Sequence, residues 1–76
     1  MSFAGNNTIL GKGVVAAGTA SATVTISSGA SINLTNSIIN PGGTGGITVL
    51  TGGCTVNGNA IPAGTYTSID SNGQPT

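Results

Sequence analysis

Apolar and hydroxyl-bearing side chains alternate along several stretches of this chain. Residues 22–27 read Ala-Thr-Val-Thr-Ile-Ser, so every second side chain is apolar. The pattern returns at residues 32–35 and 47–49, and more loosely at 65–69. Successive side chains of a β-strand point to opposite faces. The period of two therefore predicts strands with one face on a core and one face covered by hydroxyls.

The rest of the composition favours an all-β fold. Glycine supplies 14 of the 76 residues, and both glycine and β-branched residues disfavour a helix. No segment carries a sustained apolar period of 3.6 residues. We therefore expect short antiparallel strands and hairpins, arranged as a small sandwich or barrel.

Turn signals separate the predicted strands. Asn57-Gly58 lies between two short apolar stretches and predicts a hairpin, because a type I′ turn needs positive φ at both central residues. The Ser-Ser-Gly-Ala sequence at residues 27–30 predicts a second tight hairpin. Pro62-Ala63-Gly64 predicts a further turn.

One domain covers residues 1–76, in five segments. These are an extended N-terminal arm (1–7), a first strand group (8–40), a glycine-rich break (41–46), a second strand group (47–69) and a flexible tail (70–76). The arm is expected to be disordered or to lie along a partner, and the tail to be mobile or ordered only by a neighbour. The apolar centres of the predicted strands are unevenly spaced along the chain, which argues against a regular β-helix. These centres are Val24, Ile32, Val49 and Val56.

Twelve apolar or aromatic side chains are candidates for the core or for an interface with another chain. Burial of such side chains is the main stabilising term open to a chain of this size. They are Phe3, Ile9, Leu10, Val24, Ile26, Ile32, Leu34, Ile47, Val49, Val56, Ile61 and Tyr66.

The chain has few other means of stabilisation. A single core of this size rarely supplies more than about 3–5 kcal/mol without a staple. Cys54 is the only cysteine, so no disulfide forms within the chain. Histidine is absent and Asp70 is the only acidic side chain, so four zinc ligands cannot be assembled. We therefore expect stabilisation by oligomerisation.

The charge points to the same conclusion. Lys12 is the only basic side chain, and it balances Asp70 to give zero net charge. Ordinary soluble domains are about 25% charged. A surface with almost no charge lacks the repulsion that keeps proteins apart, which favours a chain that associates with copies of itself.

Several classes of function are not expected. One lysine does not make a basic patch, and Phe3 and Tyr66 are the only aromatic residues, so nucleic acid is not expected as a partner. The longest apolar run, residues 14–17, is far shorter than the about 20 residues of a membrane-spanning helix. Without histidine a nucleophile lacks its usual base, so we expect neither catalysis nor a cofactor or metal.

The remaining reactive groups have ordinary interpretations. Lys12 is expected to be a solvated or interface charge, and the alternative is a salt bridge with Asp70. Cys54 is expected to be a small buried hydrophobe, and the alternative is an interchain disulfide. Threonine rows such as Thr23-Val24-Thr25 are typical of a solvated sheet face. Ice binding is a further alternative, which needs many evenly spaced rows.

The stretch from Cys54 to Tyr66 carries a family resemblance. It reads Cys-Thr-Val-Asn-Gly-Asn-Ala-Ile-Pro-Ala-Gly-Thr-Tyr and resembles hairpins followed by Pro-Ala-Gly-Thr-Tyr in small structural proteins of tailed bacteriophages. Those include head-decoration (cement) proteins, head fibres and tail-fibre modules. The strands of the first half are similar in their Ser, Thr and Gly content. The resemblance implies an all-β fold, trimeric or capsid-bound assembly, and no catalysis.

The expected function is therefore mechanical. We expect a subunit on the capsid surface of a virion, either decoration (cement) or fibre, that bridges neighbouring subunits. The partners would be other copies of the chain, as a trimer, and a major capsid protein. The arm at residues 1–7 is expected to be available to clamp a neighbour. The alternative is a self-assembling extracellular fibre or surface-layer subunit, because strands with little charge have weakly protected edges.

Overall fold

The computed structural model describes residues 1–15, 23–41 and 45–76, with the side chains of 11–15 excepted. All regular structure in this part of the chain is β-strand, so the predicted all-β class is confirmed. The strands are β1 (Ser2–Phe3), β2 (Asn6–Val15), β3 (Val24–Ile26), β4 (Ser31–Ile39), β5 (Ile47–Val49), β6 (Cys54–Val56), β7 (Asn59–Ile61) and β8 (Gly64–Tyr66).

The strands form two four-stranded sheets whose members come from successive turns of a coil. One sheet has the order β1-β3-β5-β8 and the other β2-β4-β6-β7. The first three strands of each sheet are parallel. Phe3 lies beside Ile26, and Ile26 beside Val49, a step of 23 residues each time. The chain thus winds as a short parallel β-helix.

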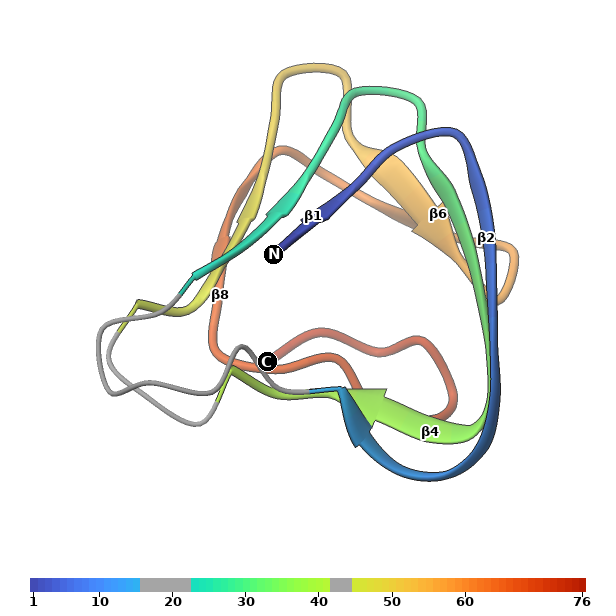
Figure 1. The fold of residues 1–76 in the computed structure, drawn as a ribbon. Coiled ribbons are helices and arrows are strands. Elements are labelled where there is room, and N and C mark those ends of the chain that lie inside the picture. Colours follow the sequence, from blue (N-terminus) through green and yellow to red (C-terminus); the bar gives the residue numbers. More distant parts are fainter. Residues whose placement is uncertain (16–22, 42–44) are drawn as a thin grey trace.

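The coil has a three-sided outline, which Figure 1 shows along the axis on which the strands stack. The two sheets form two of the walls. The third wall begins where β2 and β4 turn a corner and continue side by side through Val15 and Ile39. Single antiparallel bridges then add Ile69 beside Ile39 and Pro75 beside Ile69.

The corner in β4 is made by one residue with a left-handed backbone. Asn36 has φ of 54°, and asparagine tolerates this region better than most residues with a side chain. In β2 the matching corner is a register shift between Leu10 and Gly13. Bulges of this kind bend a strand and increase its twist, so each long strand serves two walls.

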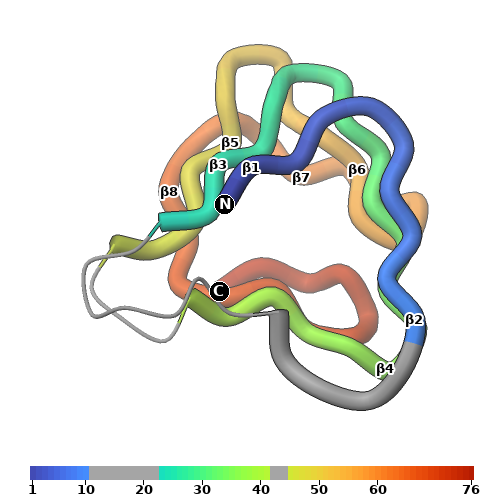
Figure 2. Tube along the Cα trace, viewed as in Figure 1, coloured from blue at the N-terminus to red at the C-terminus, as the bar shows by residue number. Residues whose placement is uncertain are grey.

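The direction of winding reverses at the predicted Asn57-Gly58 hairpin. Asn57 and Gly58 have φ of 51° and 80°, as a type I′ turn requires, and β7 returns antiparallel to β6. The chain then retraces the other walls, with β8 antiparallel to β5 and Ile69 antiparallel to Ile39. In Figure 2 this returning segment is the orange and red part of the tube.

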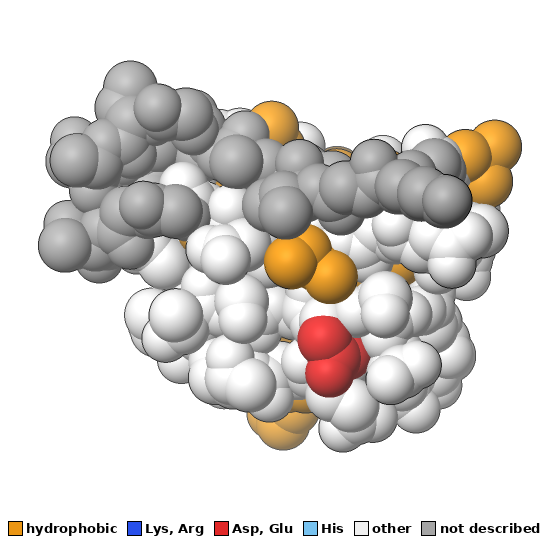
Figure 3. Space-filling model, turned by 90° about the horizontal axis from the view of Figure 1, so that it is seen from below, with side chains coloured by type: hydrophobic (Ala, Val, Ile, Leu, Met, Phe, Trp, Pro, Cys, Tyr) orange, Lys and Arg blue, Asp and Glu red, His pale blue; other side chains and the backbone are white. Residues whose placement is uncertain are grey.

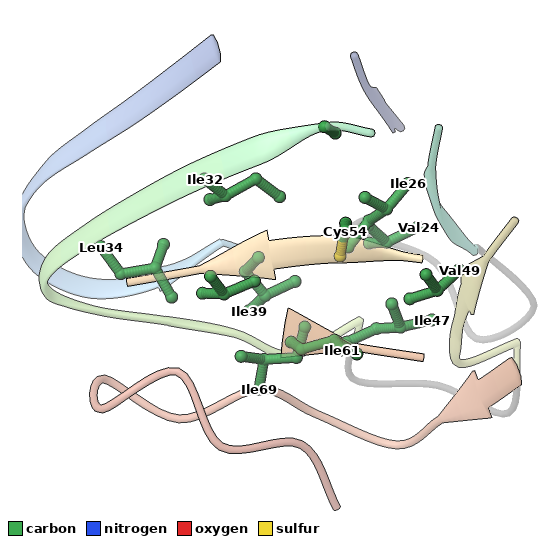
Figure 4. Packing of buried hydrophobic residues seen from close by; sticks show 12 residues of the cluster. Val24, Ile26, Ile32, Leu34, Ile39, Ile47, Val49, Cys54, Ile61 and Ile69 are labelled. Carbon is green, nitrogen blue, oxygen red and sulfur yellow. The ribbon is translucent and has the colours of Figure 1, made fainter. Parts of the chain in front are cut away.

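The core fills the inside of the coil (Figure 4). In β3 and β5, inward apolar side chains alternate with outward polar ones. Full burial of one such Val or Ile side chain contributes about 1.5–3 kcal/mol. The core cluster is Val24, Ile26, Ala30, Ile32, Leu34, Ile39, Ile47, Val49, Cys54, Val56, Ile61 and Ile69.

The predicted antiparallel pairing is wrong for four of the six strand pairs. Only β5–β8 and β6–β7 are antiparallel. The predicted hairpin at residues 27–30 is instead a corner, since β3 and β4 belong to different sheets. Gly29 there donates its N–H to the Gly53 carbonyl of the next coil at 2.9 Å. The same turn-forming residues, serine and glycine, occur in hairpins and in corners between walls. The local sequence therefore does not distinguish the two.

The prediction against a β-helix is also wrong. It compared strands that follow one another along the sequence, and these belong to different walls. The relevant spacing joins strands of the same wall, where Ile32 follows Asn7 by 25 residues and precedes Val56 by 24. The corners differ in length by one or two residues, which hides the repeat.

Both chain ends lie against the coil. Residues 1–7, expected as an extended arm, run beside β3 and β4 of the same chain, and Thr25 and Ser27 donate to the carbonyls of Met1 and Phe3, both at 2.9 Å. Residues 70–76, expected to be mobile, also lie against the chain, with Thr67 donating to the Thr76 carbonyl at 2.7 Å. Backbone hydrogen bonds hold both terminal segments against the rest of the chain. Residues 42–44 of the predicted break lie outside the described residues.

Candidate functional site

The twelve predicted core or interface residues divide into three groups. Eight are buried in the core: Val24, Ile26, Ile32, Leu34, Ile47, Val49, Val56 and Ile61. Phe3, Ile9 and Tyr66 are partly buried and pack against it. Leu10 remains outside, with 75% of its surface exposed. Of the two predicted roles, core or interface, the exposure of Leu10 leaves the interface.

Three core residues were not among the twelve candidates or otherwise predicted to be buried. Ala30 is small and lies in a turn signal. Ile39 lies beyond the bend at Asn36, which breaks the period of two. Ile69 lies in the loosely alternating stretch 65–69, so the pattern held a signal for it. All three have at most 1% of their surface exposed.

Cys54 is buried, as predicted from its position at the start of an apolar stretch. Burial raises the pKa of its thiol above the ordinary value of 9.0, because the thiolate loses hydration. A thiol of this kind is a poor nucleophile at neutral pH.

The first coil ends in an edge with which no further described strand pairs, the open β2 edge. The strands β1 and β2 stand at the ends of their sheets. On the inner side, Ser31 donates to the Gly5 carbonyl at 2.8 Å. The N–H and C=O groups of successive residues in a strand face its two sides alternately. Those of Asn7 and Ile9 therefore face β4, and those of Asn6, Thr8 and Leu10 face away from it. No described strand pairs with that outward side.

The open edge also carries exposed apolar surface. Leu10 is the most exposed large hydrophobic residue of the described chain, and Met1 follows at 55%. Asn7 is half-buried and donates its Nδ2 to the Ala4 carbonyl at 3.0 Å. The edge between Asn6 and Leu10 contains no charged side chain.

The opposite end is blunt by comparison. Its strands β7 and β8 are three residues long. Pro62 lies between them, and Pro75 ends the third wall beside Ile69. Proline has no N–H to offer, and short strands with proline are a common protection of sheet edges. The two ends of the coil therefore differ in their capacity to add a further strand.

A row of hydroxyls crosses the outer face of the first sheet. Ser2, Thr25, Thr48 and Thr65 occupy neighbouring positions on the four strands. Strands in a sheet lie about 4.7–4.9 Å apart. This is one regular row, whereas an ice-binding face needs several.

The two charged residues lie in different parts of the fold. Asp70 accepts hydrogen bonds at Oδ1 from the backbone N–H groups of Asn72 and Gln74, both at 2.9 Å. Asp70 therefore fixes the turn of the tail. In Figure 3 it is the single red side chain on the face shown. Lys12 lies in β2 within the register shift. Its side chain is outside the described part, and so is the predicted salt bridge.

No other type of site is found in the described part of the chain. Residues 1–10, 23–41 and 45–76 bring no three His, Cys, Asp or Glu side chains together for a metal, and the described surface has no pocket. The described residues include no helix long and apolar enough to cross a membrane.

Comparisons with known proteins give no relative. No family model, no curated protein and no solved structure matches this chain.

Proposed function

We propose that this chain is a non-catalytic structural subunit of a virion, a capsid decoration (cement) or fibre protein that bridges neighbouring subunits. The observation that carries the proposal is the open β2 edge with Leu10 exposed beside it. An unpaired strand next to apolar surface favours association. The near absence of charge supports the same role.

The work of such a subunit is to add buried area between its neighbours. Each Å² of apolar surface removed from water contributes about 25 cal/mol. A small stabilisation per copy adds up when many copies bind to one capsid. The chain would bind a major capsid protein and other copies of itself. The segment Cys54–Tyr66, which resembles phage structural proteins, forms the reversing hairpin and β8.

Capsids that lack the protein provide the test. The purified chain should bind them at a fixed ratio to the major capsid protein, and it should raise the temperature at which they release their contents. An unrelated neutral β protein of similar size is the control. Failure to bind, or binding without a fixed ratio, would count against the proposal.

A second candidate is a subunit of an extracellular fibre or surface layer. The observation in its favour is that the strands of this fold stack along one axis, so an open edge could extend a fibre. Light scattering distinguishes the two candidates, because a fibre subunit grows without limit at increasing concentration. A discrete small oligomer favours the virion subunit.

A further inference from the structure

We infer that the open β2 edge is the site at which two copies of this chain pair head to head, β2 against β2, as a closed dimer. The inference does not depend on the virion role, and it is incompatible with the unlimited growth that the fibre candidate requires. It rests on three features of the described chain: the regular stretch of the edge, its lack of charge, and the blunt opposite end.

The regular stretch limits the pairing to five residues. From Asn6 to Leu10 each residue of β2 keeps the same offset of 25 from its partner in β4, and the register shifts directly after Leu10. A second strand can follow the edge only while it is regular. The centre of the stretch is Thr8, whose backbone N–H and C=O face outward by the alternation of the ladder.

Twofold symmetry then fixes the register. An isologous contact places the same surface of both copies together. With the axis at Thr8, this residue pairs with Thr8 of the second copy, and Asn6 pairs with Leu10. The two Leu10 side chains would thereby cover part of their exposed surface. Lys12 falls beyond the paired stretch, within the register shift between Leu10 and Gly13.

Charge and the form of the two ends favour a second copy as the occupant. The stretch Asn6–Leu10 is neutral and so presents no pattern for a charged partner. The far end of another copy cannot continue the pairing in the same way, because β7 and β8 have three residues each and Pro62 lies between them. Association therefore stops at two copies.

The area predicts a reversible contact. The paired stretch of five residues is about 17 Å long, so it buries much less than the about 800 Å² that one partner buries in a standard interface. We therefore expect monomer and dimer to exchange within an accessible range of concentration.

Light scattering or sedimentation over a concentration series tests the inference. The full chain should approach twice its mass of 7.2 kDa and no more. Leu10→Lys should weaken the dimer at least tenfold, because it places a charge in the paired stretch. The matched control is Leu50→Lys, at a leucine that is 43% exposed outside the strands. It should change the dissociation constant less than twofold.

A cysteine at the symmetry axis tests the register. Thr8→Cys should form a disulfide-linked dimer on mild oxidation, because directly opposed residues have Cα atoms about 5.5 Å apart. Asn6→Cys is the control two positions away, where the two sulfurs would lie about 13 Å apart along the strands and should not link. Cys54 remains in both variants and is buried.

Four results would overturn the inference. They are a monomer at every concentration, growth beyond two copies, an oligomer equally tolerant of both lysine variants, and equal cross-linking at positions 6 and 8. Circular dichroism confirms that each variant is folded, and both leucines are exposed, so loss of the fold is not expected from either lysine.

Discussion

At the scale of single residues, Asn57 joins three parts of the chain. Its backbone has the positive φ of the reversing turn. Its Oδ1 accepts the N–H of Leu34 at 2.6 Å, and its Nδ2 donates to the Ser71 carbonyl at 2.9 Å. The pairing of β4 with β6 ends at Ile32. Beyond it, the Asn57 side chain accepts the Leu34 N–H that a longer β6 would otherwise have bound.

Substitution of Asn57 separates these contributions. Asn57→Gly keeps the backbone conformation and loses both hydrogen bonds, so the free energy of unfolding should fall by about 1–3 kcal/mol. Asn57→Ala should cost about 1 kcal/mol more, since alanine disfavours positive φ. Urea unfolding measures both. Equal stability of Asn57→Gly and the wild type would show that the two hydrogen bonds contribute nothing.

Cys54 links burial to the pH dependence of stability. Its raised pKa means that the unfolded chain loses the thiol proton at lower pH than the folded chain does. The free energy of unfolding should therefore be unaffected by this group below pH 9.0, and it should fall above that pH by at most about 1.4 kcal/mol per pH unit.

Cys54→Ala is the comparison for that pH profile. The variant is expected to be less stable at neutral pH, because the sulfur fills space in the core. All other ionisable groups are the same in both proteins, so the difference between the two profiles isolates the thiol. A constant difference between about pH 8 and about pH 10.5, on either side of the ordinary thiol pKa, would contradict the prediction.

At the scale of elements, the C-terminal tail is held by close contact as well as by hydrogen bonds. Gly73 is buried with φ of 79°, and a Cβ there would press on the Val56 carbonyl oxygen. Asn59 donates its Nδ2 to the Asn72 carbonyl at 2.9 Å beside it. The tail therefore packs directly on the reversing hairpin.

Gly73→Ala should separate the tail from the hairpin. The expected loss in free energy of unfolding is about 1–3 kcal/mol from the steric contact, in addition to about 1–2 kcal/mol of backbone strain. Gly29→Ala is the matched control, because Gly29 has φ of 74° but no atom within 4 Å of the place that a Cβ would occupy. Thermal unfolding of the two variants compares them, and equal losses would mean that the contact is relieved without cost.

At the scale of the whole molecule, one core is shared by all coils. Ile32 is fully buried between neighbouring coils, whereas Leu10 is largely exposed on the edge. The coils support one another only through such stacked side chains, because each coil alone has too little to bury.

A pair of alanine variants tests this division between core and edge. Ile32→Ala should lower the free energy of unfolding by about 2–5 kcal/mol, which is a large part of the total for a domain of this size. Leu10→Ala should change it by less than about 0.5 kcal/mol. Chemical denaturation at a concentration where the chain is monomeric is the measurement. A large loss from Leu10→Ala would mean that the edge is already packed within one chain.

Local sequence indicated most of the strands of this protein, but not β1 and β2, which no alternating stretch predicted. The period of two identified the stretches at residues 22–27, 32–35 and 47–49, because a pleated strand in contact with a core must alternate. The Asn57-Gly58 turn was predictable for a similar reason, since few dipeptides accept positive φ twice. Eight buried candidates followed from the same pattern.

Only the tertiary structure decided how these elements pair. A strand of alternating residues presents the same inward face to a parallel or an antiparallel neighbour, so direction is not encoded within it. The parallel stacking, the third wall through Ile39 and Ile69, and the position of Leu10 at a sheet edge depend on which segments stack on one another. Those are contacts between residues far apart along the chain, whose energy depends on the whole coil, and no local pattern specifies them.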